Sequence, residues 1–177
     1  MRTELTTERL TLRGLHLSDA PRIAALADDW ELARWLARVP HPYRLEDAQR
    51  WLETQIESWD AGLGYSFAIQ TGGDLIGCFG IDKVGEPDRF EIGYWLGRPF
   101  WGQGFATEAG RAAIDFCWRD LGLTSLAATH HVDNAASAQV LAKLGFVATG
   151  REEIWSLARQ AFMPAVAVRL DRDRTAP

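Results

Sequence analysis

Residues 90–109 read FEIGYWLGRPFWGQGFATEA, a pattern typical of a strand, a tight glycine-containing loop and the start of a helix. Glycine lets the backbone approach a ligand closely, and Gly102 and Gly104 stand just before the expected helix. The unpaired N–H groups of such a loop and of the first helical turn favour a bound anion. The segment therefore has the features of a phosphate-binding turn.

Three kinds of phosphate site can be compared with this loop. A Walker A loop needs Lys and Ser/Thr after its second glycine, and Gln103-Gly104 stand there instead. A dinucleotide fingerprint needs a third glycine, where the chain has Thr107, and it belongs to the first βα unit of a fold. A strand-to-helix connection with no ligand stays open at this point, because a lone Gly-x-Gly is common.

The elements on either side of this loop indicate an α+β fold. Apolar alternation predicts strands, and apolar residues every three to four positions predict helices. The expected strands are Leu5–Leu15, Tyr65–Gln70, Leu75–Val84, Arg89–Leu96, Leu123–Thr129, Phe146–Thr149, Ile154–Leu157 and Ala165–Leu170. One helix is expected between Ser18 and Pro40, and others over Ala48–Trp59, Ala106–Leu121 and Asn134–Gly145. Residues 1–177 are expected to form one domain with a mixed, mostly antiparallel sheet of about seven strands, about four helices and a frayed tail over 171–177.

Composition narrows the function classes. The 19 Lys and Arg against 24 Asp and Glu give a net charge of −5 without a basic cluster, which argues against a nucleic-acid partner. The two cysteines, Cys78 and Cys117, are expected to be reduced thiols in a cytoplasmic protein. The first residues lack the apolar region of a signal peptide, and no apolar stretch reaches the ~18 residues of a membrane span, so no membrane partner is expected.

Two stretches of the chain resemble motifs of the GNAT superfamily of N-acetyltransferases. Tyr94–Leu96 with Trp101–Ala109 looks like its acetyl-CoA motif. Asn134–Ser137 with Leu141–Phe146 is similar to its second motif, and the two follow in the same order. The chain thus resembles a GNAT-like domain that uses acetyl-CoA as co-substrate.

Two further stretches resemble the Rim-type branch, which is named for acetylation of ribosomal-protein N-termini. They are Thr7–Arg13 and the segment Pro40–Tyr43 with Glu46–Ala48. The resemblance implies transfer of acetyl to a primary amine, first of all a protein or peptide N-terminal α-amine, by direct attack in a ternary complex. A small amine such as an amino acid, polyamine or antibiotic is the alternative, and a non-catalytic acyl-CoA-binding module is a second. Homodimers are common in that branch, and nothing in this sequence decides the oligomeric state.

The resemblance also implies the cofactor site. The pyrophosphate would lie on loop amides and the pantetheine arm beside the strand that ends at Leu96. The cofactor-binding residues expected on this basis are Leu96, Trp101, Gly102, Gln103, Gly104, Phe105, Ala106, Thr107, Asn134 and Ser137. The family often has Gln or Arg where this chain has Pro99, with Arg98 beside it.

Acetyl transfer needs a base, an oxyanion donor and an acid. An amine of pKa ~8 to ~10.4 is mostly protonated at pH 7, so a base helps, and Glu91 stands where many relatives carry a glutamate. A backbone N–H near Leu96 or Gly97 would meet the oxyanion. The family's usual tyrosine acid is replaced by Leu141. Ser137 stands where the resembled Rim-type branch places a serine that can contact the cofactor sulfur, so the resemblance implies Ser137 as the acid, and a first-turn hydroxyl bonded to the backbone is the alternative.

Other residues of these types are expected to be structural. The histidines lack metal-ligand spacing, so no metal site is predicted. His130 and His131 are neighbours at a strand end, so at most one should face a cleft. Asn134 suits a helix N-cap as well as a cofactor contact. Core packing is the expected role of Trp30, Trp35 and Tyr43, although the resemblance places them at the acceptor mouth.

Overall fold

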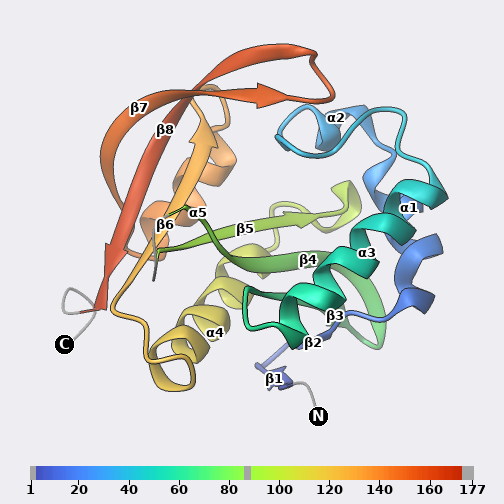
Figure 1. Cartoon of the computed structure of the whole chain (residues 1–177), viewed down its shortest axis with the longest axis horizontal. Helices are drawn as coiled ribbons and strands as arrows, with labels where there is room; N and C mark the ends of the chain where they lie inside the picture. Colours follow the sequence, from blue (N-terminus) through green and yellow to red (C-terminus); the bar gives the residue numbers. More distant parts are fainter. Residues whose placement is uncertain (1–2, 86–88, 173–177) are drawn as a thin grey trace.

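The structure, a computed structural model, describes residues 3–85 and 89–172. Within these ranges eight strands form one sheet in the order β1-β2-β3-β4-β5-β6-β8-β7 (Figure 1). Neighbours are antiparallel except β5 and β6, which are parallel, so the expected α+β fold with a mixed, mostly antiparallel sheet is confirmed. The strands are β1 Leu5–Thr6, β2 Thr11–Gly14, β3 Gly64–Thr71, β4 Asp74–Lys83, β5 Phe90–Leu96, β6 Ser125–His131, β7 Val147–Ser156 and β8 Ala161–Asp171.

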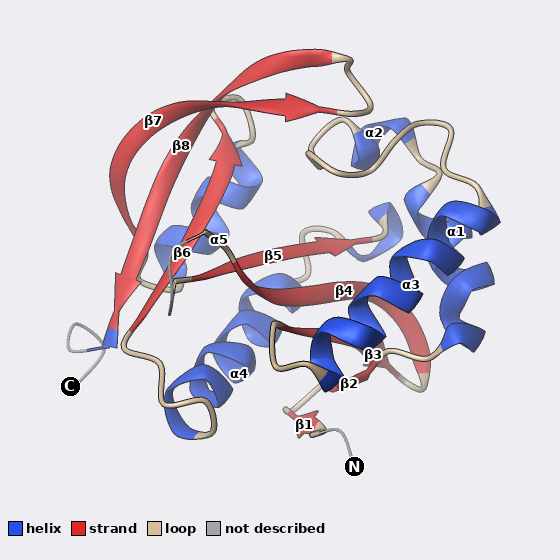
Figure 2. Ribbon diagram, viewed as in Figure 1, coloured by secondary structure: helices blue, strands red, loops and turns tan. Residues whose placement is uncertain are grey.

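Helices cover both faces of the sheet (Figure 2). They are α1 Ala20–Ala27, α2 Trp30–Ala33, α3 Leu45–Asp60, α4 Phe105–Arg119 and α5 Ala135–Lys143. On one face α1 and α3 bury Ile23 and Leu52. On the other, α4 presents Phe105, Ala109 and Phe116 at helical spacing to the main core. These two layers hold the sheet between them.

Three elements differ from the prediction, two of them because of a local polar contact. The expected strand Leu5–Leu15 is divided into β1 and β2 by a turn in which Thr7 N–H donates to Leu10 O at 2.9 Å. The first expected helix is divided into α1 and α2 because the Asp29 carboxylate accepts the N–H of Glu31 and starts a new helix. The two expected strands Phe146–Thr149 and Ile154–Leu157 form one continuous strand, β7, which has a register shift between Ala148 and Gly150. Asp171 still belongs to β8, and the predicted tail beyond residue 172 lies outside the described residues.

The parallel strands β5 and β6 separate almost as soon as they meet. Their single register pair is Glu91 with Ala127, near the start of each strand. Beyond it β5 continues beside β4 and β6 continues beside β8, and the two diverge in Figure 1. The sheet is therefore open between the ends of β5 and β6.

The turn between β7 and β8 reaches across this opening to the segment after α2. Leu157 N–H donates to Ala37 O at 3.0 Å, and Arg159 Nε donates to Arg34 O at 2.8 Å. The guanidinium of Arg159 also lies 4.9 Å from the Trp35 ring centroid. Figure 1 shows the hairpin arching toward α2. These contacts make a roof, residues 34–38 and 155–160, over the open part of the sheet.

Candidate active site

A cavity of about 1020 Å³ lies in the opening between β5 and β6. We call it the cleft. Its walls come from β4, β5, β6 and β7, the loop before α4, the start of α5 and the residues after α2. The cleft is lined by the predicted site residues Glu91, Leu96, Trp101, Gly102, Gly104, Phe105, Ala106, Thr107, Asn134 and Ser137. Of the predicted site residues, Gln103 alone does not line it. The divergence of two strands thus brings together residues that are up to 46 positions apart in the chain.

The loop before α4 has the conformation that its glycines indicate. Gly102 and Gly104 have φ values of +73° and +82°, which L-residues with a side chain rarely adopt. Gly104 is the N-cap of α4 and accepts the N–H of Glu108. The N–H groups of residues 105–107 therefore have no acceptor within the helix and lie at the cleft wall. This end of α4 can hold an anion.

Side chains of the loop brace it rather than face a ligand. The Gln103 amide donates to Pro99 O at 3.0 Å, and the Trp101 indole N–H donates to Leu96 O at 2.6 Å. Arg98, the residue beside Pro99, pairs with Asp29 at 2.9 Å and so ties the loop to α2. Any contact of Gln103 with a cofactor would therefore use its main chain.

Arg9 fixes the loop from the other side. Its guanidinium pairs with Glu108 at 2.6 Å, donates to Gln103 O at 2.9 Å and lies 4.6 Å from the Phe105 ring centroid. Burial raises the pKa of Glu108, but hydrogen bonds from Thr7 and Arg9 outweigh it and hold that pKa below its usual range. This contact explains why the N-terminal stretch belongs to the site, a role that its sequence pattern alone did not reveal.

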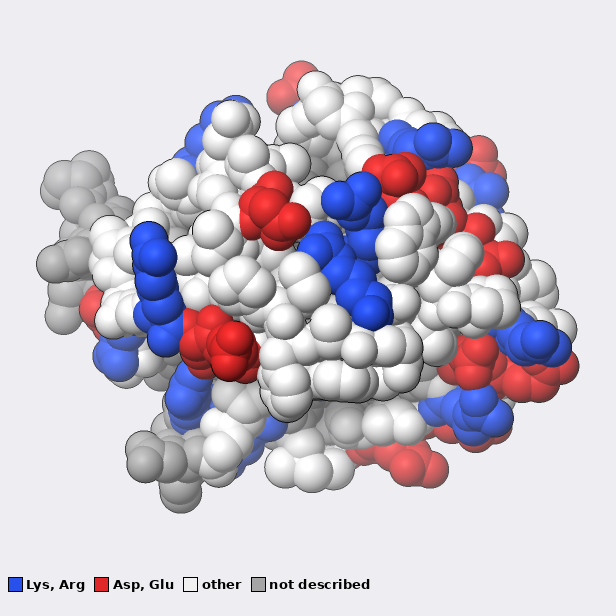
Figure 3. Space-filling view, turned by 90° about the horizontal axis from the view of Figure 1, so that it is seen from above, with Lys and Arg blue, Asp and Glu red and all other residues white. Residues whose placement is uncertain are grey.

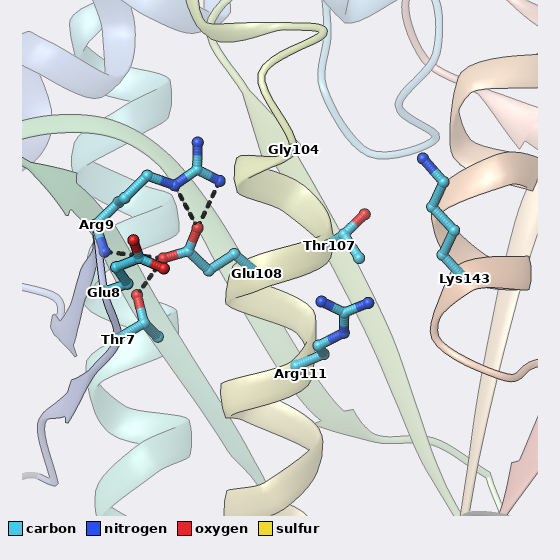
Figure 4. A pocket seen from close by; sticks show the side chains of 8 residues that line it. All are labelled: Thr7, Glu8, Arg9, Gly104, Thr107, Glu108, Arg111 and Lys143. Atoms are coloured by element: carbon cyan, nitrogen blue, oxygen red, sulfur yellow. Dashed lines mark hydrogen bonds and ion pairs between the residues drawn. The ribbon is translucent and has the colours of Figure 1, made fainter.

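A second cavity, of about 840 Å³, lies beside the start of α4 (Figure 4). Thr107, Arg111 and Lys143 line it together with the Arg9–Glu108 pair. Neither Arg111 nor Lys143 forms an ion pair with another residue of the ranges 3–85 and 89–172. Gly104, Thr107 and Lys143 line both cavities, so a phosphate group on the α4 N–H groups would have cationic side chains within one connected site.

Glu91 shares its face of the sheet with a second carboxylate. It stands opposite Asp82 on β4, and both residues line the cleft. Burial raises the pKa of each carboxyl group, and the positive charge of Arg38 partly opposes this. The next pair on the same face of the sheet is Gly80 with Gly93, and a Cβ at Gly93 would meet nothing within 4 Å. A hollow therefore lies beside the carboxylate pair on the α3 side of the sheet.

Ser137 meets a phenol that the sequence prediction did not include. The Ser137 and Tyr94 hydroxyl oxygens lie 3.0 Å apart, and burial raises the pKa of Tyr94 to about 12. The side-chain oxygen of Asn134 accepts the Ser137 N–H at 3.1 Å, so Asn134 is the N-cap of α5. Leu141, at the position of the family's usual acid, is buried in the core. A protonated phenol from β5 therefore stands beside the predicted acid.

Backbone alternation leaves one of the two predicted oxyanion donors available. Gly97 N–H donates to Ile76 O at 2.9 Å and is engaged within the sheet. Because N–H groups on an antiparallel strand alternate in direction, the N–H of Leu96 points away from β4, toward the opening. The expectation for Gly97 is therefore wrong, and Leu96 is the remaining candidate.

The aromatic and histidine residues expected to be structural divide between core and cleft, and Tyr43 packs in the core as expected. Trp35 and Tyr43 line the cleft, whereas Trp30 does not. Both His130 and His131 line it, although at most one was expected to face a cleft, and His131 is buried there. Cys78 and Cys117 are buried and free.

Metal and membrane features can be checked in the same way. Among residues 3–85 and 89–172 no group of three or more His, Cys, Asp or Glu is arranged to hold a metal ion. None of the helices described is both long and apolar enough to cross a membrane. On the face seen in Figure 3, acidic and basic side chains are interspersed over a largely uncharged surface.

Comparison with known proteins agrees with this geometry. Residues 9–147 match the model of the acetyltransferase (GNAT) domain. The chain belongs to the GNAT family. It is therefore an N-acetyltransferase by family. The matched range contains the loop before α4, the ends of β5 and β6, and α5.

Individual relatives support the assignment. The uncharacterised N-acetyltransferase p20 of Bacillus licheniformis is 30% identical over 149 residues, covering 82% of this chain and 83% of p20. The [ribosomal protein uS5]-alanine N-acetyltransferase of Escherichia coli strain K12 is 28% identical over 164 residues, covering 84% and 80%. The fold is that of Mycobacterium smegmatis RimJ in complex with CoA-disulfide, with a TM-score of 0.86 at 21% identity over 99% of this chain and 89% of RimJ.

Proposed function

We propose that this protein transfers the acetyl group of acetyl-CoA to the α-amine of a protein or peptide N-terminus. The observation that carries the proposal is the open sheet, which places an anion-binding helix end and a carboxylate pair on one continuous cleft. The name of the E. coli relative, which acts on a ribosomal protein, supports a protein acceptor.

Acetyl-CoA is proposed for the α4 side of the cleft. The N–H groups of residues 105–107 suit its pyrophosphate, because they are unpaired and lie at the positive end of a helix. Arg111 and Lys143 supply positive charge for a further phosphate in the adjoining cavity. The complex of RimJ with CoA-disulfide supports a CoA ligand for this fold.

The acceptor is proposed for the α3 side, where Asp82 and Glu91 attract a positively charged amine. Glu91 removes the proton, because only a neutral amine can attack the acetyl carbonyl. Burial raises the pKa of Glu91, which strengthens it as a base. The wall of the cleft includes both Glu91 and residues of the roof, and the acceptor peptide is proposed to lie between them.

Three further groups complete the reaction. The Leu96 N–H stabilises negative charge that develops on the carbonyl oxygen as the C–N bond forms. When the C–S bond breaks, the Ser137 hydroxyl donates a proton to the departing sulfur and is reprotonated by Tyr94 across their 3.0 Å contact. Glu91 passes the first proton to solvent and accepts the second proton that the attacking nitrogen loses as the amide forms. Solvent then takes this proton from Glu91 and returns one to Tyr94.

Thiol release from acetyl-CoA tests the proposal. Acceptors would be Ser- and Ala-starting octapeptides, polyamines and free amino acids, with Glu91→Gln, Ser137→Ala and Tyr94→Phe alongside. We expect release with peptides and a loss in Glu91→Gln that leaves the acetyl-CoA Kd unchanged. Release with free amines alone would favour the small-amine function, and acetyl-CoA binding with no release for any acceptor would favour a binding module.

A further inference from the structure

His131, the last residue of β6, has a buried imidazole without a hydrogen-bond partner. Its side chain is 1% exposed. Neither Nδ1 nor Nε2 is bonded to any part of the chain in residues 3–85 and 89–172. Buried polar groups are paired in the great majority of cases, and an unpaired one calls for an explanation. Since His131 lines the cleft, a group that enters the cleft can be its partner.

The protonation state of His131 decides which partner suits it. Burial lowers its pKa, and the positive charge of Arg159 lowers it further, against an opposing effect of Asp133. The imidazole is therefore neutral at pH 7, with one N–H donor and one acceptor nitrogen. A peptide group offers the matching carbonyl and N–H, whereas an ammonium group offers only donors.

The strand register places His131 on the acceptor side of the cleft. Ala127 is level with Glu91, and alternation puts Ala127, Thr129 and His131 on one face of β6. Thr129 donates to Glu152 at 2.8 Å on that same face. Ala127 and His131 are four positions apart, which is about 13 Å along a strand. An extended peptide whose amine lies at Glu91 covers that distance in about four residues.

The other walls around His131 belong to the roof. The Trp35 ring centroid lies 6.4 Å from that of His131, and Arg34 and Arg159 both lie over the Trp35 ring. Arg159 in turn pairs with Asp133 at 3.5 Å. His131 thus faces the part of the cleft that is closest to the roof, away from the carboxylate pair.

We propose that His131 is an acceptor-binding residue that hydrogen-bonds a peptide group within the first four residues of the acceptor chain. It would favour peptides over single amines, which have no peptide group at that distance. The inference rests on the proposed function, because it assumes a peptide acceptor.

Steady-state kinetics with three variants test the inference. His131→Met keeps much of the volume and removes both hydrogen-bonding nitrogens, His131→Asn keeps a donor and an acceptor, and His16→Met is the same change at an exposed histidine. With an octapeptide that the wild-type protein acetylates as substrate, we expect His131→Met to raise KM about tenfold, which corresponds to the loss of one hydrogen bond, and to leave kcat little changed. His131→Asn should recover part of this, and His16→Met should match the wild type.

Two controls separate binding from structure. The alanine amide, which ends after one residue, should show the same KM in His131→Met as in the wild type. The Tm of His131→Met should equal or exceed that of the wild type, by up to about 2–4 °C, because an unpaired polar group has been removed.

Each other outcome overturns the inference. An unchanged octapeptide KM in His131→Met would mean that only water pairs with the imidazole. A lower Tm with equal losses for octapeptide and alanine amide would mean a structural role. If the wild-type protein acetylates small amines and no peptide, the proposed function fails and this inference fails with it. If it acetylates peptides and His131→Met has no effect on KM, the inference alone fails.

Discussion

Replacing Gly104 by alanine should separate the stability of the phosphate-binding turn from its binding function. Gly104 has a φ of +82°, so alanine there costs about 1–2 kcal/mol of backbone strain. Its Cβ would lie 3.4 Å from a guanidinium nitrogen of Arg9, a flexible neighbour, so little further cost is expected. For a protein of this size the strain lowers Tm by about 2–8 °C.

The matched control is Gly122→Ala at the other end of α4. Gly122 has a φ of +65°, and a Cβ there would meet nothing within 4 Å. The two variants should therefore lose similar Tm. Only Gly104→Ala turns the N–H groups at the start of α4 away from a phosphate. Losing one charge-assisted hydrogen bond, about 1.5–3 kcal/mol, weakens binding about 10- to 100-fold.

Isothermal titration calorimetry with acetyl-CoA and thermal unfolding of the free proteins measure both effects. The reasoning is refuted if Gly104→Ala and Gly122→Ala bind acetyl-CoA with the same Kd. It is also refuted if the two variants lose clearly different amounts of Tm. Since their φ angles are similar, the backbone strain would then not explain the loss.

Three other substitutions test the proposed base Glu91, the contacts by which Arg9 holds the loop, and the ion pair between Asp19 and Arg13. Glu91→Gln should lower kcat about 10²- to 10⁴-fold, and the wild-type rate should fall with decreasing pH through a pKa above the usual carboxyl value, as a pH–rate profile would show. Arg9→Met should raise the acetyl-CoA Kd severalfold in calorimetry, because it frees Glu108 and the loop. Asp19→Ala should lower the free energy of unfolding in urea by about 3 kcal/mol, because it leaves Arg13 without its 2.8 Å partner. Burial raises the pKa of Asp19, but the hydrogen bonds from Arg13 and from the His16 N–H, together with the positive charge of Arg13, outweigh it and hold that pKa below its usual range. The stabilisation is therefore present at pH 7 and is lost as pH falls through the folded-state pKa.

Features set by local geometry could be predicted from the sequence, and those set by distant contacts could not. The loop glycines and the Asn134 cap follow from backbone preferences within a few residues. The turn at Thr7 and the new helix start at Asp29 depend on side-chain bonds that periodicity does not reveal. The proximity of Tyr94 to Ser137 depends on where β5 and β6 separate, and the Arg9–Glu108 pair joins residues 99 positions apart.

The roof has a steric consequence for how a substrate can enter. Hydrogen bonds from the β7–β8 turn to Arg34 and Ala37 close a ring of chain along one wall of the cleft. A loop passing through such a ring would bring two backbones side by side, which takes at least about 4.8 Å plus the width of both chains. A free chain end needs room for only one. An acceptor that enters under the roof therefore passes it more easily with a chain end than with a loop.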